Sequence, residues 1–429
     1  MNLRGAAASL APWSGAACCA CALASVAVGY TMPAWYWSVL GALAAATLLA
    51  ARIGDSERWA QTTVWPVAVI LGSITVSATC GDDPRESVER YATMPAFAAV
   101  FLAVQIAGWN PRALRAVLIA GATALAIVTI GLCVEWVSRA SMHARPGVRV
   151  VGGLGNANDV AAAALLVPLC GAAAAGSRWR PVAHVLGALA AGSASALAAS
   201  RQAVVATVIA LVAPLCVPLT RRRALVAIAL GLAILATAAL TSPPLRLRLV
   251  RAWESGVVVG SRAQLVVFGA EKLMDRPWLG HGPGLFDRLY AKGVASGESW
   301  AGAKLSPIGM PWVHCLPLEI GIDLGVTGVA AFGSVAFAAT RRLRAADRRA
   351  DAMARAVAAA SGVMLLSIAA IGLVDLTLLK DWFRCILWLA LGLAFVTGPM
   401  ASPRPKDVAE TPAKGPEPAF PAEKLVARA

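Results

Sequence analysis

The chain has 429 residues, of which 59% are hydrophobic and only 14% are charged, and its mean hydropathy is +0.69. A soluble domain carries about 25% charged residues, so this composition excludes an ordinary soluble protein. The net charge of +15 does not indicate a nucleic-acid partner, because the basic residues lie between apolar runs and form no patch.

Apolar runs recur along the chain, each long enough to cross a bilayer core of about 30 Å. They predict an all-α integral membrane protein with about 12 transmembrane helices. The first run is interpreted as a retained span and not as a cleaved signal peptide, because a second apolar run follows it at once. The predicted spans are 13–32, 34–51, 60–80, 93–109, 113–137, 157–175, 182–199, 202–219, 224–241, 316–340, 353–372 and 382–398.

The short loops between these spans separate into two sets by their charge. Every second loop is rich in arginine, and the positive-inside rule assigns that side to the cytoplasm. Both chain ends fall on the same side. The arginines that carry this bias are Arg52, Arg58, Arg112, Arg115, Arg178, Arg180, Arg221, Arg222, Arg223, Arg341, Arg342, Arg344, Arg348, Arg349 and Arg355.

Residues 1–399 are therefore expected to form one polytopic membrane domain. Its single long loop, at about 242–315, lies on the outer side between spans nine and ten. This loop is basic, which favours an anionic ligand. The alternative is a solvated cap whose arginines reach lipid headgroups. Residues 400–429 are rich in Pro, Ala, Lys and Glu and are expected to form a disordered cytoplasmic tail.

Two outer segments carry candidate residues in the middle of the chain. Arg149 precedes a glycine-rich stretch with Asn156 and Asn158, just before an apolar helix. A helix N-terminus there would present N–H groups to an anion or a sugar, and the alternative is a plain turn with an asparagine cap. Arg201 lies between two apolar runs, where a charge facing lipid is costly. It is a functional candidate, and the alternative is an interfacial anchor.

The long loop and its exit carry the remaining candidates. Arg262 opens a helical stretch, which ends at Arg276 before a glycine-rich turn. That turn follows no strand, so it is not a dinucleotide-binding loop. His314 directly precedes the tenth span and can act as a general base near neutral pH. The alternative for a lone histidine is a structural role.

Four of these segments, in this order, resemble motifs of the O-antigen ligase and polymerase superfamily of lipid-linked glycan transferases. The resemblance covers about residues 149–395. Three positions depart from the usual pattern, because Ala157, Cys315 and Asp323 stand where Pro, Asn and Glu are usual. The residues that carry the resemblance are Arg149, Gly152, Asn156 and Asn158; Ser200, Arg201 and Ala203; Arg262, Pro277, Gly280, Gly282, Gly284 and Phe286; and His314, Asp323, Gly325 and Gly328.

The resemblance implies a glycosyltransferase of the O-antigen ligase type in the bacterial inner membrane, with its active site facing the periplasm. Such an enzyme passes a glycan from undecaprenyl diphosphate to a hydroxyl, which in ligases belongs to a sugar of the lipid A core. It is implied to need no metal ion and no cofactor. Alternatives are an O-antigen polymerase, which uses a second lipid-linked repeat as acceptor, and, ranked lower, a protein O-oligosaccharyltransferase or a lipid-linked glycan transporter.

The resemblance also implies roles for single residues. His314 would remove the acceptor proton, while Arg201 and Arg262 would neutralise the departing diphosphate through bidentate contacts. Asp375, in an outer turn, would orient the histidine or contact a sugar, and the alternative is a hydrogen-bonded helix end. His281 occupies a variable slot, so its replacement is expected to matter little. The candidates for substrate binding are Arg149, Asn156, Asn158, Arg276 and Asp375.

Overall fold

The computed structural model describes residues 3–28, 33–138, 157–198, 204, 206–209, 229, 233, 260–297, 299–300, 303–304, 312–347, 351–373 and 376–396. The chain divides into two units, Met1–Gly398 and Pro399–Ala429, and all the described residues lie in the first. The predicted tail at 400–429 and nearly all of the predicted spans 202–219 and 224–241 fall outside the described residues.

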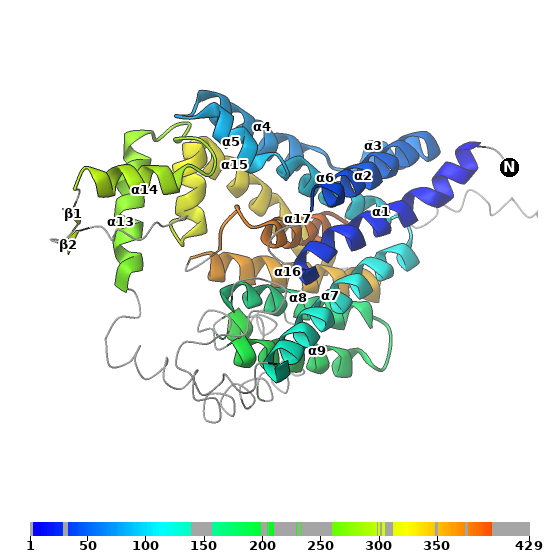
Figure 1. Ribbon diagram of the computed structural model, residues 1–429. Helices are drawn as coiled ribbons and strands as arrows, with labels where there is room; N and C mark the ends of the chain where they lie inside the picture. Colours follow the sequence, from blue (N-terminus) through cyan, green and yellow to red (C-terminus); the bar gives the residue numbers. More distant parts are fainter. Residues whose placement is uncertain are drawn as a thin grey trace, which may run out of the picture. The chain divides into compact units, whose positions relative to one another are not determined.

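Helices make up almost all of the described structure, and the strands β1 (Ser299–Trp300) and β2 (Ala303–Lys304) form one short antiparallel pair (Figure 1). In the first half of the chain the helices are α1 (Leu3–Val28), α2 (Ala34–Gly54), α3 (Ser56–Gln61), α4 (Trp65–Cys80), α5 (Pro84–Tyr91), α6 (Met94–Ala107), α7 (Pro111–Ser138), the 3₁₀ helix η3 (Ala157–Val160), α8 (Ala161–Ala173) and α9 (Arg180–Ala198). The second half holds α13 (Gly260–Asp275), α14 (Phe286–Ala295), α15 (Leu316–Asp347), α16 (Ala352–Gly372) and α17 (Asp381–Val396).

The fold is that of an all-α membrane protein, as the hydropathy predicts. Among the described residues, seven helical segments are long and apolar enough to cross a membrane. Helices α4 and α8 are apolar but shorter. Apart from the two spans that lie almost wholly outside the described residues, every predicted span overlaps a helix, although the bounds differ by several residues. The seven segments are Leu3–Ala27, Trp35–Gly54, Pro84–Ala107, Pro111–Ser138, Arg180–Ala198, Leu316–Ala346 and Ala352–Gly372.

Polar contacts join the helix ends that the arginine bias assigns to one side. The Arg58 guanidinium donates to the carbonyl of Trp109 at 3.4 Å. The Arg342 guanidinium donates to the carbonyl of Phe395 at 3.3 Å and to the hydroxyl of Thr63 at 3.0 Å. These residues belong to four different helix ends that the arginine bias assigns to the cytoplasmic side. The fold therefore brings together helix ends that the charge pattern places on one side of the membrane.

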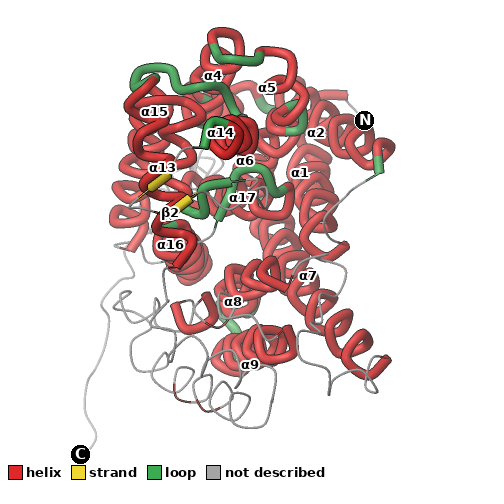
Figure 2. Tube along the Cα trace, turned by 60° about the vertical axis from the view of Figure 1, so that its left-hand side comes forward, coloured by secondary structure: helices red, strands yellow, loops and turns green. Residues whose placement is uncertain are grey.

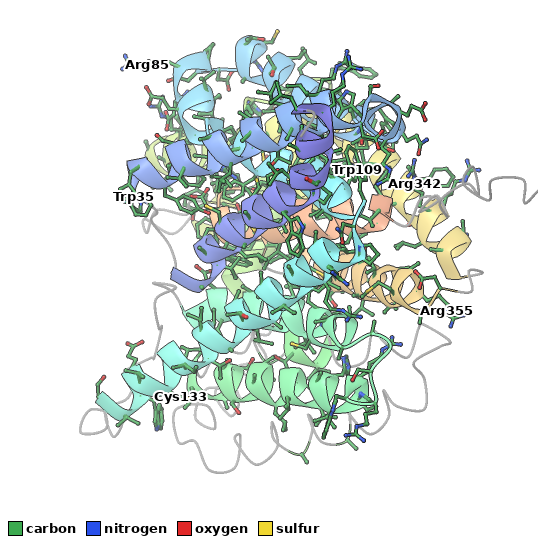
Figure 3. The ribbon with its side chains drawn as sticks, turned by 90° about the vertical axis from the view of Figure 1, so that its right-hand side faces the viewer. Trp35, Arg85, Trp109, Cys133, Arg342 and Arg355 are labelled. Atoms are coloured by element: carbon green, nitrogen blue, oxygen red, sulfur yellow. The ribbon has the colours of Figure 1, made fainter. Side chains whose placement is uncertain are left out.

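Residues of the opposite set of ends also lie together. In Figure 3, Trp109, Arg342 and Arg355 lie on the right of the view, whereas Trp35, Arg85 and Cys133 lie on the left. The alternation of helix ends along the chain therefore agrees with the predicted topology. We refer below to the end that carries Arg85 as the outer end.

Close helix packing depends on small residues, as is usual where lipid supplies no hydrophobic force between helices. Helix α1 packs against α6 at Gly15, where an added Cβ would lie 2.6 Å from the carbonyl oxygen of Ala103. Helix α17 packs against α6 at Gly392, where an added Cβ would lie 3.0 Å from the carbonyl oxygen of Phe101. Larger side chains at these glycines would push the helices apart.

Candidate functional site

Segments far apart in the sequence meet at the outer end of the helices. They are the residues before α15, the connector 376–380 before α17, the helix η3, the turn 276–285 and the pair α4–α5. Helices α13 and α14 both contact α15, and α14 lies in front of the bundle in the view of Figure 2. Hydrogen bonds and ion pairs hold these segments together.

His314 has an unusual backbone conformation. Its φ of 59° is the only positive value at a non-glycine position among the described residues, and such a conformation costs roughly 1–2 kcal/mol. The indole Nε1 of Trp312 donates to the imidazole Nδ1 of His314 at 3.1 Å. Because an indole N–H can only donate, Nδ1 is an acceptor here, and a neutral ring carries its proton on Nε2.

A buried ion pair lies behind Trp312. The ammonium of Lys380 is 4.8 Å from the centre of the Trp312 ring and pairs with a carboxylate oxygen of Asp159. The two side chains are only 5% and 1% exposed. Asp159 belongs to η3, which follows the Arg149 motif directly. The ion pair thus brings η3 and the histidine segment together.

Helix α15 is broken at Gly325, whose φ of 67° is not helical. A break in a membrane helix leaves backbone groups without partners unless neighbouring segments supply them. The turn after α13 does so, because the Val326 N–H donates to the Pro277 carbonyl at 2.7 Å and the His281 N–H donates to the Ile322 carbonyl at 2.8 Å. The glycine-rich turn therefore serves to hold this broken helix.

Asp323 connects the same turn to the first half of the chain. Its Oδ2 accepts hydrogen bonds from the Gly284 N–H at 2.9 Å and from the Tyr91 hydroxyl at 3.2 Å. Its carbonyl accepts from the Ser77 hydroxyl at 2.5 Å and from the Gly282 N–H at 3.2 Å. The third and fourth sequence motifs are thus one structural unit that is attached to α4 and α5.

Arg276 and His281 are both held by Asp82, at the end of α4. The Arg276 guanidinium lies 3.1 Å from one carboxylate oxygen of Asp82 and donates to the Cys80 carbonyl at 3.2 Å. The His281 ring is buried, with Nδ1 2.7 Å from the other oxygen of Asp82 and Nε2 2.8 Å from the Lys272 carbonyl. That replacing His281 has little effect on transfer stays a prediction, and the two polar contacts of its buried ring indicate a role in stability.

A network of ion pairs joins α5 to α14. The Arg90 guanidinium pairs with Glu86 and, at 2.7 Å, with Asp287, while Arg288 pairs with both Asp83 and Glu86. Asp83 also caps α5, and the hydrogen bond from the Glu86 N–H, together with Arg288, lowers the pKa of its carboxyl. The α14 part of the long loop is thus anchored to a helix of the first half.

The connector before α17 is fixed from two sides. The Glu319 Oε1 accepts from the Thr377 hydroxyl at 2.7 Å and from the Leu378 N–H at 2.8 Å. The buried Arg384 guanidinium donates to the Leu378 carbonyl and, at 2.6 Å, to the Thr93 hydroxyl. Lys380 therefore projects from a well-supported segment.

Not all of the predicted site residues can be placed. Arg149, Asn156, Arg201 and Asp375 lie outside the described residues. Arg262 lies in the first turn of α13, which confirms that a helix begins there.

Asn158 lies within η3, and the N-cap residue of α8 is Val160. The predicted roles of Asn158 stay predictions, because its side chain is outside the described part of the structure.

Several residues at the outer end were not singled out from the sequence. Asp159 and Lys380 flank apolar runs. A charged residue at the outer end of a span was the feature that could have identified them from the sequence. Asp82 gave no signal, because its partners Arg276 and His281 are far away in the chain. Trp312 gave none either, because its contact with Lys380 forms only in the folded chain. In the described part of the chain, no group of three or more His, Cys, Asp or Glu side chains is arranged to hold a metal ion.

Comparison with known families agrees with the sequence motifs. Residues 185–333 match the O-antigen ligase family, which confirms the resemblance to the O-antigen ligase superfamily. The matched segment includes Arg201, Arg262, Arg276 and His314. No curated protein matches the chain.

Proposed function

We propose that this chain, with its O-antigen ligase segment, passes a glycan from undecaprenyl diphosphate to a hydroxyl of the lipid A core. The family supports a role in ligating or polymerising lipid-linked glycans. The observation that carries the proposal is that the matched segment holds Arg201, Arg262 and His314, the residue types that this chemistry requires.

The reaction replaces one bond to the anomeric carbon by another. The bond from this carbon to the diphosphate oxygen breaks, and its electron pair leaves with the diphosphate. A bond forms to the acceptor oxygen, and the hydroxyl proton passes to His314. In the arrangement that the structure describes, Nδ1 is the ring atom with a lone pair, so Nδ1 takes up this proton.

Arg201 and Arg262 stabilise the departing diphosphate in this proposal. Negative charge grows on the leaving group as the bond breaks, and preorganised cations lower the barrier. The planar guanidinium fork binds two phosphate oxygens and keeps its charge. Supporting contacts to the glycan and the diphosphate would come from Arg149, Asn156, Asn158, Arg276 and Asp375, although Asp82 already engages Arg276.

We place the site at the periplasmic face of the bacterial inner membrane. This follows from the arginine bias of the opposite helix ends, which marks the cytoplasmic side. His314, Trp312 and Lys380 all lie at the outer end, next to the loop that carries α13 and α14.

Transfer by purified protein tests the chemistry. With lipid-linked donor and acceptor in detergent, His314→Ala should lower kcat by about 10²–10⁴-fold, the usual contribution of a general base. Arg201→Ala and Arg262→Ala should abolish transfer, and the lysine variants should recover only part of it, because lysine lacks the fork. Activity should survive EDTA. Full activity of His314→Ala, or loss with EDTA that Mg²⁺ restores, would contradict the proposal.

The acceptor is identified in cells. In a deletion strain, a ligase defect removes all long chains from lipid A while lipid-linked polymer accumulates. A polymerase defect instead leaves lipid A capped by a single repeat, and this pattern would replace the ligase assignment by polymerase. A transporter would give no transfer in detergent, where there are no compartments.

A further inference from the structure

We infer that Trp312, resting on the Lys380–Asp159 ion pair, is a positioning residue that fixes the orientation and the protonated nitrogen of His314. The inference rests on the proposed function, in which His314 is the base. It adds three residues to that function, and none of them was a candidate from the sequence.

A hydrogen bond joins Trp312 to His314. The indole N–H of Trp312 donates to Nδ1 of His314 at 3.1 Å, and the two rings are 5.4 Å apart at an angle of 60°. The bond selects the neutral tautomer with its proton on Nε2. The left-handed backbone at His314 shows that the surrounding structure imposes the position of this side chain.

The Lys380 side chain supports the ring of Trp312. The Lys380 ammonium lies 4.8 Å from the centre of the Trp312 ring and 5.8 Å from that of Trp382. A cation over an aromatic face is attracted to it, and more strongly when it is shielded from water. A buried ammonium is stable only beside an anion, and Asp159 supplies that anion.

The connector that carries Lys380 is held firmly in place. The connector that carries Lys380 is tied to Glu319 through the Thr377 hydroxyl and the Leu378 N–H. Arg384 binds the carbonyl of the same Leu378. The position of the Lys380 ammonium is therefore determined by two helices, α15 and α17, and it can hold Trp312 in one place.

The consequence concerns the proton transfer. The acceptor hydroxyl and the indole N–H both donate along the Nδ1 lone pair, so the hydroxyl takes the place of the indole when it binds. Until then the indole keeps the ring turned so that Nδ1 is ready. Without Trp312 the ring loses the donor that selects the Nε2-protonated tautomer.

A simpler role for the ion pair would be to tie η3 to the connector, with no effect on His314. The two roles differ in what the variants do. Trp312→Phe keeps the ring under Lys380 but removes the N–H. The double variant Lys380→Met/Asp159→Asn removes both charges, whereas each single variant removes only one charge of the buried pair and should lower the amount of folded protein. Trp179→Phe, at an exposed tryptophan, is the matched control.

Nitrogen NMR of histidine-labelled protein in lipid bilayers gives a readout that needs no substrate, since the chain has only four histidines. We expect His314 to show the Nε2-protonated tautomer in wild type and in Trp179→Phe. In Trp312→Phe and in the double variant we expect a mixture of both tautomers.

An Nδ1-protonated ring in wild type would overturn the inference. So would a folded double variant, or a Trp312→Phe variant, that keeps the wild-type tautomer. If wild type transfers no glycan in any assay, the proposed function fails, and the NMR comparison still decides whether Trp312 positions His314.

Discussion

Replacing Asp323 by alanine should destabilise the outer end of the molecule far more than a surface substitution does. The Asp323 side chain is 1% exposed. Its Oδ2 is the acceptor for both the Gly284 N–H and the Tyr91 hydroxyl. Alanine removes this acceptor and leaves both donors buried.

The structure sets the size of the effect. A buried donor that loses its acceptor costs about 1–3 kcal/mol, so two donors cost about 2–6 kcal/mol. The bonds from Ser77 and Gly282 go to the Asp323 carbonyl and survive the substitution. Asp323→Asn keeps one acceptor oxygen, and its cost should be about 1–2 kcal/mol.

Equilibrium unfolding of the detergent-solubilised protein measures these differences. A central value of about 4 kcal/mol corresponds to roughly a 10³-fold change in the ratio of folded to unfolded protein. Glu271→Ala, at an exposed carboxylate on α13, is the matched control and should change stability by less than about 0.5 kcal/mol. If Asp323→Ala were as stable as this control, the idea that Asp323 joins the turn to α5 would be refuted.

Three further predictions concern topology, pH and the glycine-rich turn. In a background without reactive native cysteines, Glu298→Cys should react with a membrane-impermeant thiol reagent in intact spheroplasts. Ala350→Cys should react only after the spheroplasts are lysed. The reverse pattern would show that the topology is inverted. Hydrogen bonding lowers the pKa of Asp83, so the contribution of this carboxylate to stability should be complete above the ordinary pKa of an aspartate and disappear as the pH falls through the lowered value. The difference in unfolding free energy between wild type and Asp83→Asn should therefore shrink over that pH window. A difference that grows on acidification would contradict the assignment. His281→Ala should lower the unfolding free energy by about 2–3 kcal/mol, because it removes a buried side chain with two polar partners, and a variant with wild-type stability would show that these contacts are unimportant.

The membrane fold follows from the sequence because lipid imposes a simple rule. A charged or polar stretch cannot remain in the bilayer core, so apolar runs mark the helices and arginine marks their inner ends. The predicted run 93–109 shows the limit of this rule. The structure contains a separate helix, α5, directly before this run, and the charged residues of α5 pair with α14. Hydropathy alone reports no such partner.

The residues around His314 were harder to find, for a physical reason. Asp159 and Lys380 are 221 residues apart, and each looks like an ordinary charge at the end of an apolar run. Only the folded chain shows that they neutralise each other behind Trp312. The same holds for Asp323, which the motif identifies but whose partners Ser77 and Tyr91 lie in a half of the chain that carries no motif.

The broken helix at Gly325 has a consequence for how the protein is made. The turn 276–285 leaves the ribosome after α4 but before α15, so its backbone partners in α15 do not yet exist when it first reaches the outer surface. The contact between Ser77 and Asp323 closes a loop of 246 residues. The outer end therefore becomes fixed only after α15 has entered the bilayer, late in biogenesis. A nascent chain that stalls earlier would display the turn without its α15 partners, and we expect membrane quality-control proteases to recognise it.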